Sequence, residues 1–408
     1  MLNLVLGTAG TGKTYYITQQ TANAVKSGKK AILLVPEQFS FETEKSLFRL
    51  LGADGAINAE VLSFSRLADR IFREYGGLAG KYIDETGKYL LMSIAADEVK
   101  DSIELYSKHL ASTAFIKNLT ALSSELKASA VNPQTLINAK TGDDSLNGKI
   151  NELGLILSAY DSLLKNDLRD EQDNLLRAAE LVRGQSFFND FIIMVDGFAA
   201  FMNAEYKMLE CIIQTAPCVT VALCADCLYD GDGGMGVFSA PKKTAQRLID
   251  IAHNNGVEVS EPVVMQNSYR FKNGELCHLQ QNFLRPRPKK YSSKPQNIKV
   301  IEAQNIYGEL EFAASEIKRL VMHESYKYSS FAVITRSLDN FETAVEDVFS
   351  KYEIPFFMDK REDVYSMPLT YFLLTSLEAV KINFSAGAGI RVVKCAVSGV
   401  DSGATAGV

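Results

Sequence analysis

Short apolar runs alternate with amphipathic stretches in the first 80 residues, and this order predicts alternating strands and helices. Residues 2–6 and 31–35 are almost continuously apolar, as expected of strands that are buried on both faces of a parallel sheet. Residues 15–25 repeat apolar positions at helical spacing. Residues 61–64 predict a weaker third strand, followed by a helix that ends at Gly76 and Gly77. The pattern favours an α/β fold.

The pattern changes between about residues 80 and 185, where apolar positions recur every three or four residues and no strand is expected. We interpret this region as a helical insertion. Sheet-type runs return at residues 191–195 and 219–223. Residues 1–285 are therefore predicted to form one α/β domain that a helical insertion interrupts.

A proline-rich basic stretch at residues 286–297 predicts a linker. Beyond it, residues 298–303 and 331–335 are predicted strands of a second α/β unit, with a helix over 309–322 between them. This second domain, residues 298–383, is expected to be incomplete. The tail at 384–408 is rich in Gly, Ala, Ser and Val and has no clear period, so it is left unassigned, and the chain is expected to stop inside a domain.

Composition narrows the class of protein. A chain of 408 residues is too long for one hydrophobic core, so two or three domains are expected. The shares of hydrophobic residues, 47%, and of charged residues, 23%, are typical of globular proteins. We expect no membrane span, because no apolar stretch approaches 18 residues, and no signal peptide. Six cysteines without a framework pattern favour reduced thiols and a cytoplasmic location. The net charge of −6 argues against binding of nucleic acid through the overall charge of the protein, but it allows a local basic groove.

The clearest chemical motif lies between the first predicted strand and helix. Its residues match G-x-x-x-x-G-K-[ST], the P-loop that binds nucleotide phosphates: Gly7, Thr8, Ala9, Gly10, Thr11, Gly12, Lys13 and Thr14. Glycines let backbone N–H groups turn toward a phosphate, and the following helix adds free N–H donors. Lys13 would reach the β- and γ-phosphates of ATP, and the Thr14 hydroxyl would coordinate Mg²⁺. The alternative is a chance glycine-rich turn.

An ATPase of this class also needs an acidic strand end. Asp196 follows the predicted strand 191–195 and is the candidate for holding Mg²⁺ near Thr14. The next residue is Gly197, where such ATPases place a glutamate that activates water. Asp-Gly is also a common turn pair, so a plain turn is the competing interpretation. Nucleotide binding is therefore better supported than fast hydrolysis.

Other candidate sites are weaker. Cys224 and Cys227 form a C-x-x-C pair, but a structural zinc site usually needs two such pairs, and only Cys277 and His278 offer another cluster. Free thiols are the preferred interpretation. The remaining histidines have no carboxylate or serine at motif spacing, and no catalytic triad is predicted.

Several blocks of the sequence together resemble AddB, the B subunit of the bacterial AddAB helicase–nucleases. The blocks are LVLGTAGTGKT, ILLVPEQFSFETEKSL, VLSFSRLADRIFREYGG, FIIMVDGFAAFMNAEYKMLE and SYRFKNGELCHLQQNFLR. The resemblance covers nearly all of residues 1–380. It implies a fold of the UvrD/Rep helicase type, in which a RecA-like P-loop domain with a helical insertion precedes a second RecA-like domain.

The resemblance also implies a function and partners. It implies a subunit that works with an AddA-type helicase–nuclease on DNA single strands and double-strand ends, in break resection and recombinational repair. By position, the glycines with Lys13 and Thr14 match the ATP-binding motif. Phe64 matches an aromatic that stacks on single-stranded DNA, although it can equally be a core residue. Arg270, in SYRF, lies near a phosphate-sensing arginine, although a surface arginine is at least as plausible.

Departures from that family limit the expected activity. The loop starts at residue 7, which leaves no room for an adenine-reading glutamine segment, and Asp196 lacks a neighbouring glutamate. The later motor motifs, the nuclease domain and its iron–sulfur cysteines are not found in the 408 residues. We expect weak ATPase activity, no nuclease activity and no iron–sulfur cluster. Three alternatives stay open: a self-sufficient DNA-dependent ATPase or helicase, a small-molecule kinase, and a scaffold for AddA with a vestigial P-loop.

Overall fold

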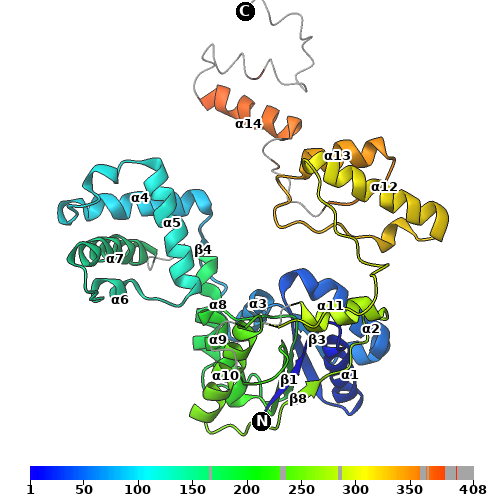
Figure 1. Ribbon diagram of the computed structural model, residues 1–408. Coiled ribbons are helices and arrows are strands. Elements are labelled where there is room, and N and C mark those ends of the chain that lie inside the picture. The colour runs from blue at the N-terminus through cyan, green and yellow to red at the C-terminus, as the bar shows by residue number, and fades with distance from the viewer. Residues whose placement is uncertain are drawn as a thin grey trace, which may run out of the picture. The chain divides into compact units, whose positions relative to one another are not determined.

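The computed structural model describes residues 1–164, 168–229, 236–283, 287–358 and 367–381, together with positions 364 and 392. The chain divides into two compact units, residues 1–298 and residues 299–408 (Figure 1). Each unit is described by itself. None of the helices in these ranges is long and apolar enough to cross a membrane.

The first unit is built on a six-stranded, wholly parallel sheet with the strand order β3-β2-β6-β7-β1-β8. Its strands are β1 (Leu2–Gly7), β2 (Lys30–Leu34), β3 (Ala59–Leu62), β6 (Phe191–Val195), β7 (Cys218–Cys224) and β8 (Val263–Met265). The strands predicted at 2–6, 31–35, 191–195 and 219–223 are confirmed. The short edge strand β8 was not predicted, and the third predicted strand ends at Leu62, so that Phe64 begins a helix instead.

Successive residues of the central strands enter two different cores, as the apolar runs require. Leu4, Leu6 and Ile193 belong to a large core on one face of the sheet, whereas Val5 and Met194 belong to a smaller core on the other. The helices that cover the larger core are α3 (Phe64–Tyr75), α8 (Asn174–Val182), α9 (Asn203–Thr215) and α10 (Ser239–Asn254). The other face is covered by α1 (Lys13–Lys26) and α2 (Ser40–Ala56), and the two groups of helices flank the strands in Figure 1.

The helical insertion has a hydrophobic core of its own. It contains α4 (Glu85–Glu98), α5 (Thr113–Ala128), α6 (Pro133–Ile137) and α7 (Asp144–Leu164). Two corrections apply to the predicted insertion. A two-residue parallel ladder joins β4 (Lys81–Tyr82) to β5 (Leu168–Arg169), so this region is not free of strands. Helix α8, which lies inside the predicted range of 80–185, packs its alanines into the larger sheet core instead.

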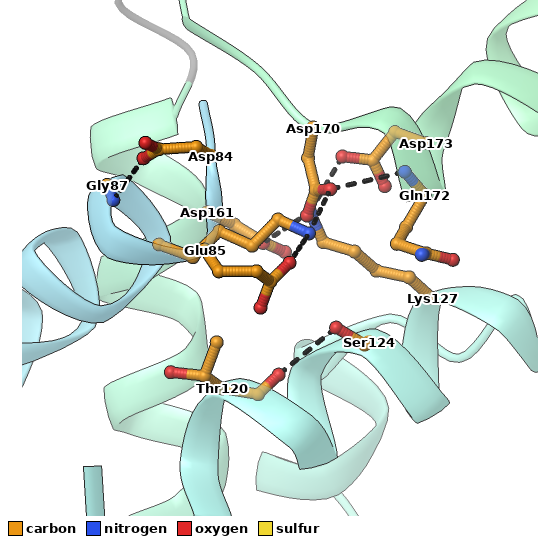
Figure 2. Close-up of polar contacts among 11 residues, drawn as sticks. Asp84, Glu85, Gly87, Thr120, Ser124, Lys127, Asp161, Asp170, Gln172 and Asp173 are labelled. Atoms are coloured by element: carbon orange, nitrogen blue, oxygen red, sulfur yellow. Dashed lines mark hydrogen bonds and ion pairs between the residues drawn. The ribbon is translucent and has the colours of Figure 1, made fainter. Parts of the chain in front are cut away.

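A cluster of ion pairs connects the segments of the insertion next to β5 (Figure 2). Lys127 of α5 lies with its Nζ atom 3.0 Å from Asp170 and 2.7 Å from Asp173, and Lys88 of α4 lies 3.2 Å from Asp170. Asp161 of α7 lies 4.0 Å from Lys127. These residues come from four separate segments, so the cluster fixes the segments against one another. We call it the lysine–aspartate cluster.

The second unit differs from the prediction. Its helices are α12 (Ile306–Glu324), α13 (Glu342–Lys351) and α14 (Pro368–Lys381), and α12 and α13 share a small core. The described residues of this unit contain no strand, so the strands predicted at 298–303 and 331–335 are wrong for this structure. Val300 and Ile334 are 94% and 91% exposed. A strand needs a neighbour for its N–H and C=O groups, and neither segment has one. The unassigned tail at 384–408 lies outside the described residues, except for position 392.

Candidate functional site

The glycine loop, residues 7–14, connects the carboxyl end of β1 to the amino end of α1. Gly10 and Gly12 have φ angles of 81° and 85°, in the left-handed region that favours glycine. A Cβ atom on Gly10 would come within 2.7 Å of the Arg270 Cβ atom. Both the backbone conformation and the space around it therefore require glycine at this position.

Helix α1 begins without a side-chain cap, because Gly12 occupies the N-cap position. The N–H groups in the first turn of a helix have no partner within the helix, and they lie at the positive end of its dipole. In α3, by contrast, the Ser63 hydroxyl accepts a hydrogen bond from the Arg66 N–H. The start of α1 thus leaves donors available to an anion.

The Lys13 side chain folds back onto the loop. Its Nζ atom donates to the carbonyl oxygens of Gly7 at 2.7 Å and Thr8 at 2.9 Å. Burial lowers the pKa of Lys13, an effect that nearby Arg270 reinforces and that Cys224 and Asp196 oppose. Within the described residues Lys13 forms no ion pair, so its hydrogen bonds go to neutral carbonyl groups and Asp196 acts on it only from a greater distance.

Asp196 follows β6 and lies at the same edge of the sheet as the glycine loop. Its side chain is buried, and its N–H donates to the Leu34 carbonyl oxygen at 3.0 Å. Burial raises the pKa of Asp196, although hydrogen bonds from the Thr14 side chain and the Gly197 backbone, and the charge of Lys13, pull it down. The structure therefore brings the two predicted Mg²⁺ ligands, Thr14 and Asp196, into contact. Gly197 has a φ of 86°, so the Asp-Gly pair also forms a turn.

A segment from the far end of this unit covers the loop. The N–H groups of Tyr269 and Arg270 donate to the Gly10 carbonyl oxygen at 2.8 Å and 3.2 Å. The Ser268 hydroxyl beside Gly10 is buried and has no hydrogen-bond partner among the described residues. The structure thus brings Arg270 to the loop, as the sequence suggested, and adds Tyr269, which the sequence interpretation missed. The Tyr269 ring lies over Gly12 and is 67% exposed.

Phe64 does not occupy the position that the sequence suggested. Its side chain is 5% exposed and packs edge-on against Phe198 and Phe201, with ring centroids 5.4 Å and 6.1 Å away. A base needs a free ring face for stacking, so Phe64 is a core residue in this structure. Phe39, which lies beside Gly197 at this edge, is 48% exposed.

The groove beside Phe64 has a volume of about 520 Å³ and lies past the carboxyl ends of β2, β3 and β6. All the charged residues that line it are acidic, namely Glu37, Asp69, Glu171 and Glu205. Glu37 is paired with Arg66 at 3.4 Å, and the other three carboxylates repel a phosphate backbone. The groove is therefore poorly suited to the backbone of DNA.

The remaining candidates are the cysteines and histidines. No group of three or more His, Cys, Asp or Glu side chains within the described ranges is placed to hold a metal ion. Cys224 and Cys227 are free thiols, and the Cys227 Sγ atom donates to the Tyr229 carbonyl oxygen. His278 contacts the backbone carbonyl oxygen of Lys289 at 2.8 Å.

Comparison with known proteins places this geometry in a family. The family model described as "ADDB, N-terminal" matches residues 4–280, which hold the glycine loop and all of the parallel sheet except the first two residues of β1. The chain belongs to the AddB N-terminal family. A second model, the UvrD-like helicase C-terminal domain, matches residues 254–403. The AddB match, the UvrD-like match and the parallel sheet together show an α/β, helicase-like fold.

Individual relatives of this AddB-family chain share one name, which describes each as the B subunit of an ATP-dependent helicase/deoxyribonuclease. The protein from Clostridium tetani is 31% identical over 96% of this chain and 35% of its own length. Those from Acetivibrio thermocellus and Caldanaerobacter subterraneus are each 33% identical over 98% of this chain, and over 36% and 35% of their own lengths. The chain thus spans about a third of the length of the curated relatives it matches.

Proposed function

We propose that this chain is the ATP-binding, DNA-contacting, helicase-like portion of the B subunit of an AddAB-type helicase–nuclease. The proposal includes an AddA-type partner subunit, and a role in resecting double-strand breaks for recombinational repair. The observation that carries it is the convergence of Lys13, Thr14, Asp196 and Arg270 on one glycine loop. The name shared by the relatives supports the rest.

The residues of the loop fit a nucleoside triphosphate bound with Mg²⁺. The uncapped start of α1 offers N–H donors, and the partnerless Ser268 hydroxyl offers another polar group beside Gly10. Lys13 would exchange its two carbonyl partners for phosphate oxygens, which are stronger acceptors for a charged donor. Thr14 and Asp196 would hold the metal ion, which supplies positive charge next to the phosphates. We further propose that Tyr269 stacks on the base and that Arg270 contacts a phosphate.

Slow turnover follows from the same geometry. Gly197 stands where a glutamate would activate water, and the Asp196 carboxyl group is itself buried beside Thr14. Orienting the attacking water is a large part of catalysis in this class. We therefore propose a subunit that binds ATP and hydrolyses it weakly. The finer fold assignment, a P-loop RecA-like domain followed by a second RecA-like domain, belongs to the same proposal.

The first experiment measures ATP binding and turnover by the purified chain, with and without single-stranded DNA. Lys13→Ala is the test variant, and Lys26→Ala, an exposed lysine at the end of the same helix, is its matched control. We expect binding that only Lys13→Ala removes, with little turnover in any protein. Strong DNA-stimulated turnover would show a self-sufficient motor instead. Absence of binding in the wild type would favour a scaffold with a vestigial loop.

A further inference from the structure

The predicted linker is not a loose connection but a folded part of the first unit. It follows α11 (Gly274–Asn282), and its described residues 287–297 lie back along that helix. The Lys289 N–H donates to the Asn282 side-chain oxygen at 3.2 Å, and the Lys289 carbonyl oxygen contacts the His278 ring. These contacts fix the first half of the segment.

A carboxylate holds the second half. Glu275, in the first turn of α11, is 9% exposed and accepts hydrogen bonds from the backbone N–H groups of Gln296 at 2.9 Å and Asn297 at 2.8 Å. The Tyr291 ring also packs edge-on against His278, with ring centroids 5.2 Å apart. Because the backbone is fixed at both ends, the side chains between them project from a defined surface.

That surface is basic throughout. From residue 276 to residue 301 the sequence contains no Asp or Glu and six Lys or Arg residues, in a chain whose net charge is −6. Arg287, Lys289, Lys290 and Lys294 are all exposed, and none of them forms an ion pair within the part of the chain that the structure describes. We call these four side chains the basic strip. Glu275, the last carboxylate before this stretch in the sequence, is already occupied by the backbone N–H groups of Gln296 and Asn297.

The spacing suits a polymer of regularly placed negative charges. Residues 287 and 294 are at most about 25 Å apart along the chain, a length comparable to about seven phosphates of one duplex strand. Between residues 287 and 297 the segment has Tyr291 as its one large apolar side chain, which leaves little apolar surface for a protein partner. The charged residues that line the groove beside Phe64 are all acidic, so the basic strip is a more favourable surface for a phosphate backbone than that groove.

We propose that the basic strip is a binding surface for the phosphate backbone of DNA. The inference deepens the proposed function, on which it rests for the identity of the polymer. Four cations that contact phosphates would displace counterions on binding, so the strip would make affinity depend steeply on salt and little on sequence.

The test replaces all four cations in the full chain, as Arg287→Gln, Lys289→Gln, Lys290→Gln and Lys294→Gln together. Binding of a labelled oligothymidine single strand and of a labelled blunt duplex is followed by fluorescence anisotropy at several salt concentrations. If all four residues contact phosphates, the slope of log K against log salt becomes shallower by about 2.8 for the single strand and 3.6 for the duplex. When salt is raised from about 50 to 200 mM, the wild type would then lose about 50-fold more affinity than the variant for the single strand and about 150-fold more for the duplex.

A matched control removes the same charge from another surface. Lys108, Lys117, Lys140 and Lys149 are exposed lysines of the helical insertion, and they are replaced by glutamine together. We expect this control to keep the wild-type slope. An equal change in both variants would overturn the proposal, because it would show an effect of net charge alone. An unchanged slope in the strip variant would overturn it as well, and loss of binding to an AddA-type partner in that variant would assign the strip to an acidic protein surface.

Nucleotide binding separates this inference from the proposed function. Both quadruple variants leave the glycine loop intact and should bind ATP like the wild type. A wild-type chain that binds DNA through the strip but binds no ATP would refute the proposed ATP site and support the strip. If the wild type binds ATP normally and the strip variant binds DNA as the wild type does, the proposed ATP site would be supported and the basic strip would be refuted.

Discussion

Two lysines of the first unit, Lys13 and Lys127, illustrate how burial can serve either binding or stability. Lys13 is partly buried against two carbonyl oxygens, and burial lowers its pKa. Lys127 is more deeply buried, yet the carboxylates of Asp173 and Asp170 more than offset the effect of burial and raise its pKa (Figure 2). Neutral carbonyls are weak partners for a cation, whereas carboxylates are strong ones.

The difference shows which lysine can change partners. Lys13 gains by meeting a negatively charged ligand, because nothing in its surroundings neutralises its charge fully. Lys127 already has its counterions, and the surrounding segments depend on them. A buried lysine without a carboxylate partner is therefore a better guide to a ligand site than a buried lysine with several.

The largest effect is expected at Lys127. The change Lys127→Met leaves Asp170, whose side chain is 2% exposed, with Lys88 as its remaining cationic partner in the described residues, and leaves Asp173 without its cation. Breaking a buried ion pair costs about 3–5 kcal/mol of unfolding free energy. Urea denaturation of the first unit measures this loss. Lys117→Met, at an exposed position of the same helix, should change stability by less than about 0.5 kcal/mol. Equal losses in the two variants would contradict a special role for the cluster.

The next effect depends on ligand. ATP with Mg²⁺ at about 100 times its dissociation constant should add about 2.7 kcal/mol to the stability of the wild-type first unit. Lys13→Ala should lose this gain, while its stability without ligand falls by about 1–3 kcal/mol because two partly buried hydrogen bonds are lost. Thermal denaturation with and without nucleotide provides the measurement. A full ligand gain in Lys13→Ala would show that this lysine makes no contact with the phosphates.

The smallest effect on stability is expected at Asp196. Replacing Asp196 by Asn should stabilise the protein, whereas the same change at Asp170 should destabilise it. Burial raises the pKa of Asp196, so its ionised form destabilises the folded state at neutral pH. Asp196→Asn should therefore stabilise the protein by about 0.5–1 kcal/mol while weakening Mg²⁺-dependent ATP binding. This gain should shrink as the pH falls, and vanish below the ordinary aspartate pKa of 3.8, where both states carry the proton.

Asp170 provides the matched comparison for that pH series. Although burial opposes its charge, Lys127 holds the pKa of Asp170 below its ordinary value, so Asp170→Asn should destabilise the protein above pH 3.8. That loss should disappear as the pH falls through the lowered pKa of Asp170. If the change in unfolding free energy followed the same course with pH in both variants, the distinction between a carboxylate poised for a ligand and a carboxylate that stabilises the fold would be refuted.

Local patterns predicted many residues of the proposed ATP site and few of the residues around it. The glycine loop could be predicted because all its residues lie within one short motif, and Asp196 because it ends an apolar run. Tyr269 was missed, although an aromatic residue directly before Arg270 in SYRF was a usable signal. The burial of Phe64 depends on Phe198 and Phe201, which lie more than 130 residues away, and no local pattern contains that information.

Strand predictions succeeded where a neighbouring strand exists and failed where none does. Residues 31–35 and 331–335 are similarly apolar, but only the first run lies between two strands of a sheet. Short elements were missed for the opposite reason, since β4, β5 and β8 have too few residues to show a period. The lysine–aspartate cluster could not be predicted either, because Lys88, Lys127 and Asp170 have no fixed spacing in the sequence.

The place of β1 in the sheet has a consequence for synthesis of the protein. Leu2 pairs with Val219, and Val5 pairs with Val263, so β1 leaves the ribosome long before its partners, which follow more than two hundred residues later. At ordinary rates of translation that delay is on the order of tens of seconds. The helices of the insertion, whose contacts are closer in sequence, can fold meanwhile. The glycine loop is thus synthesised early and reaches its final position among the last parts of its unit.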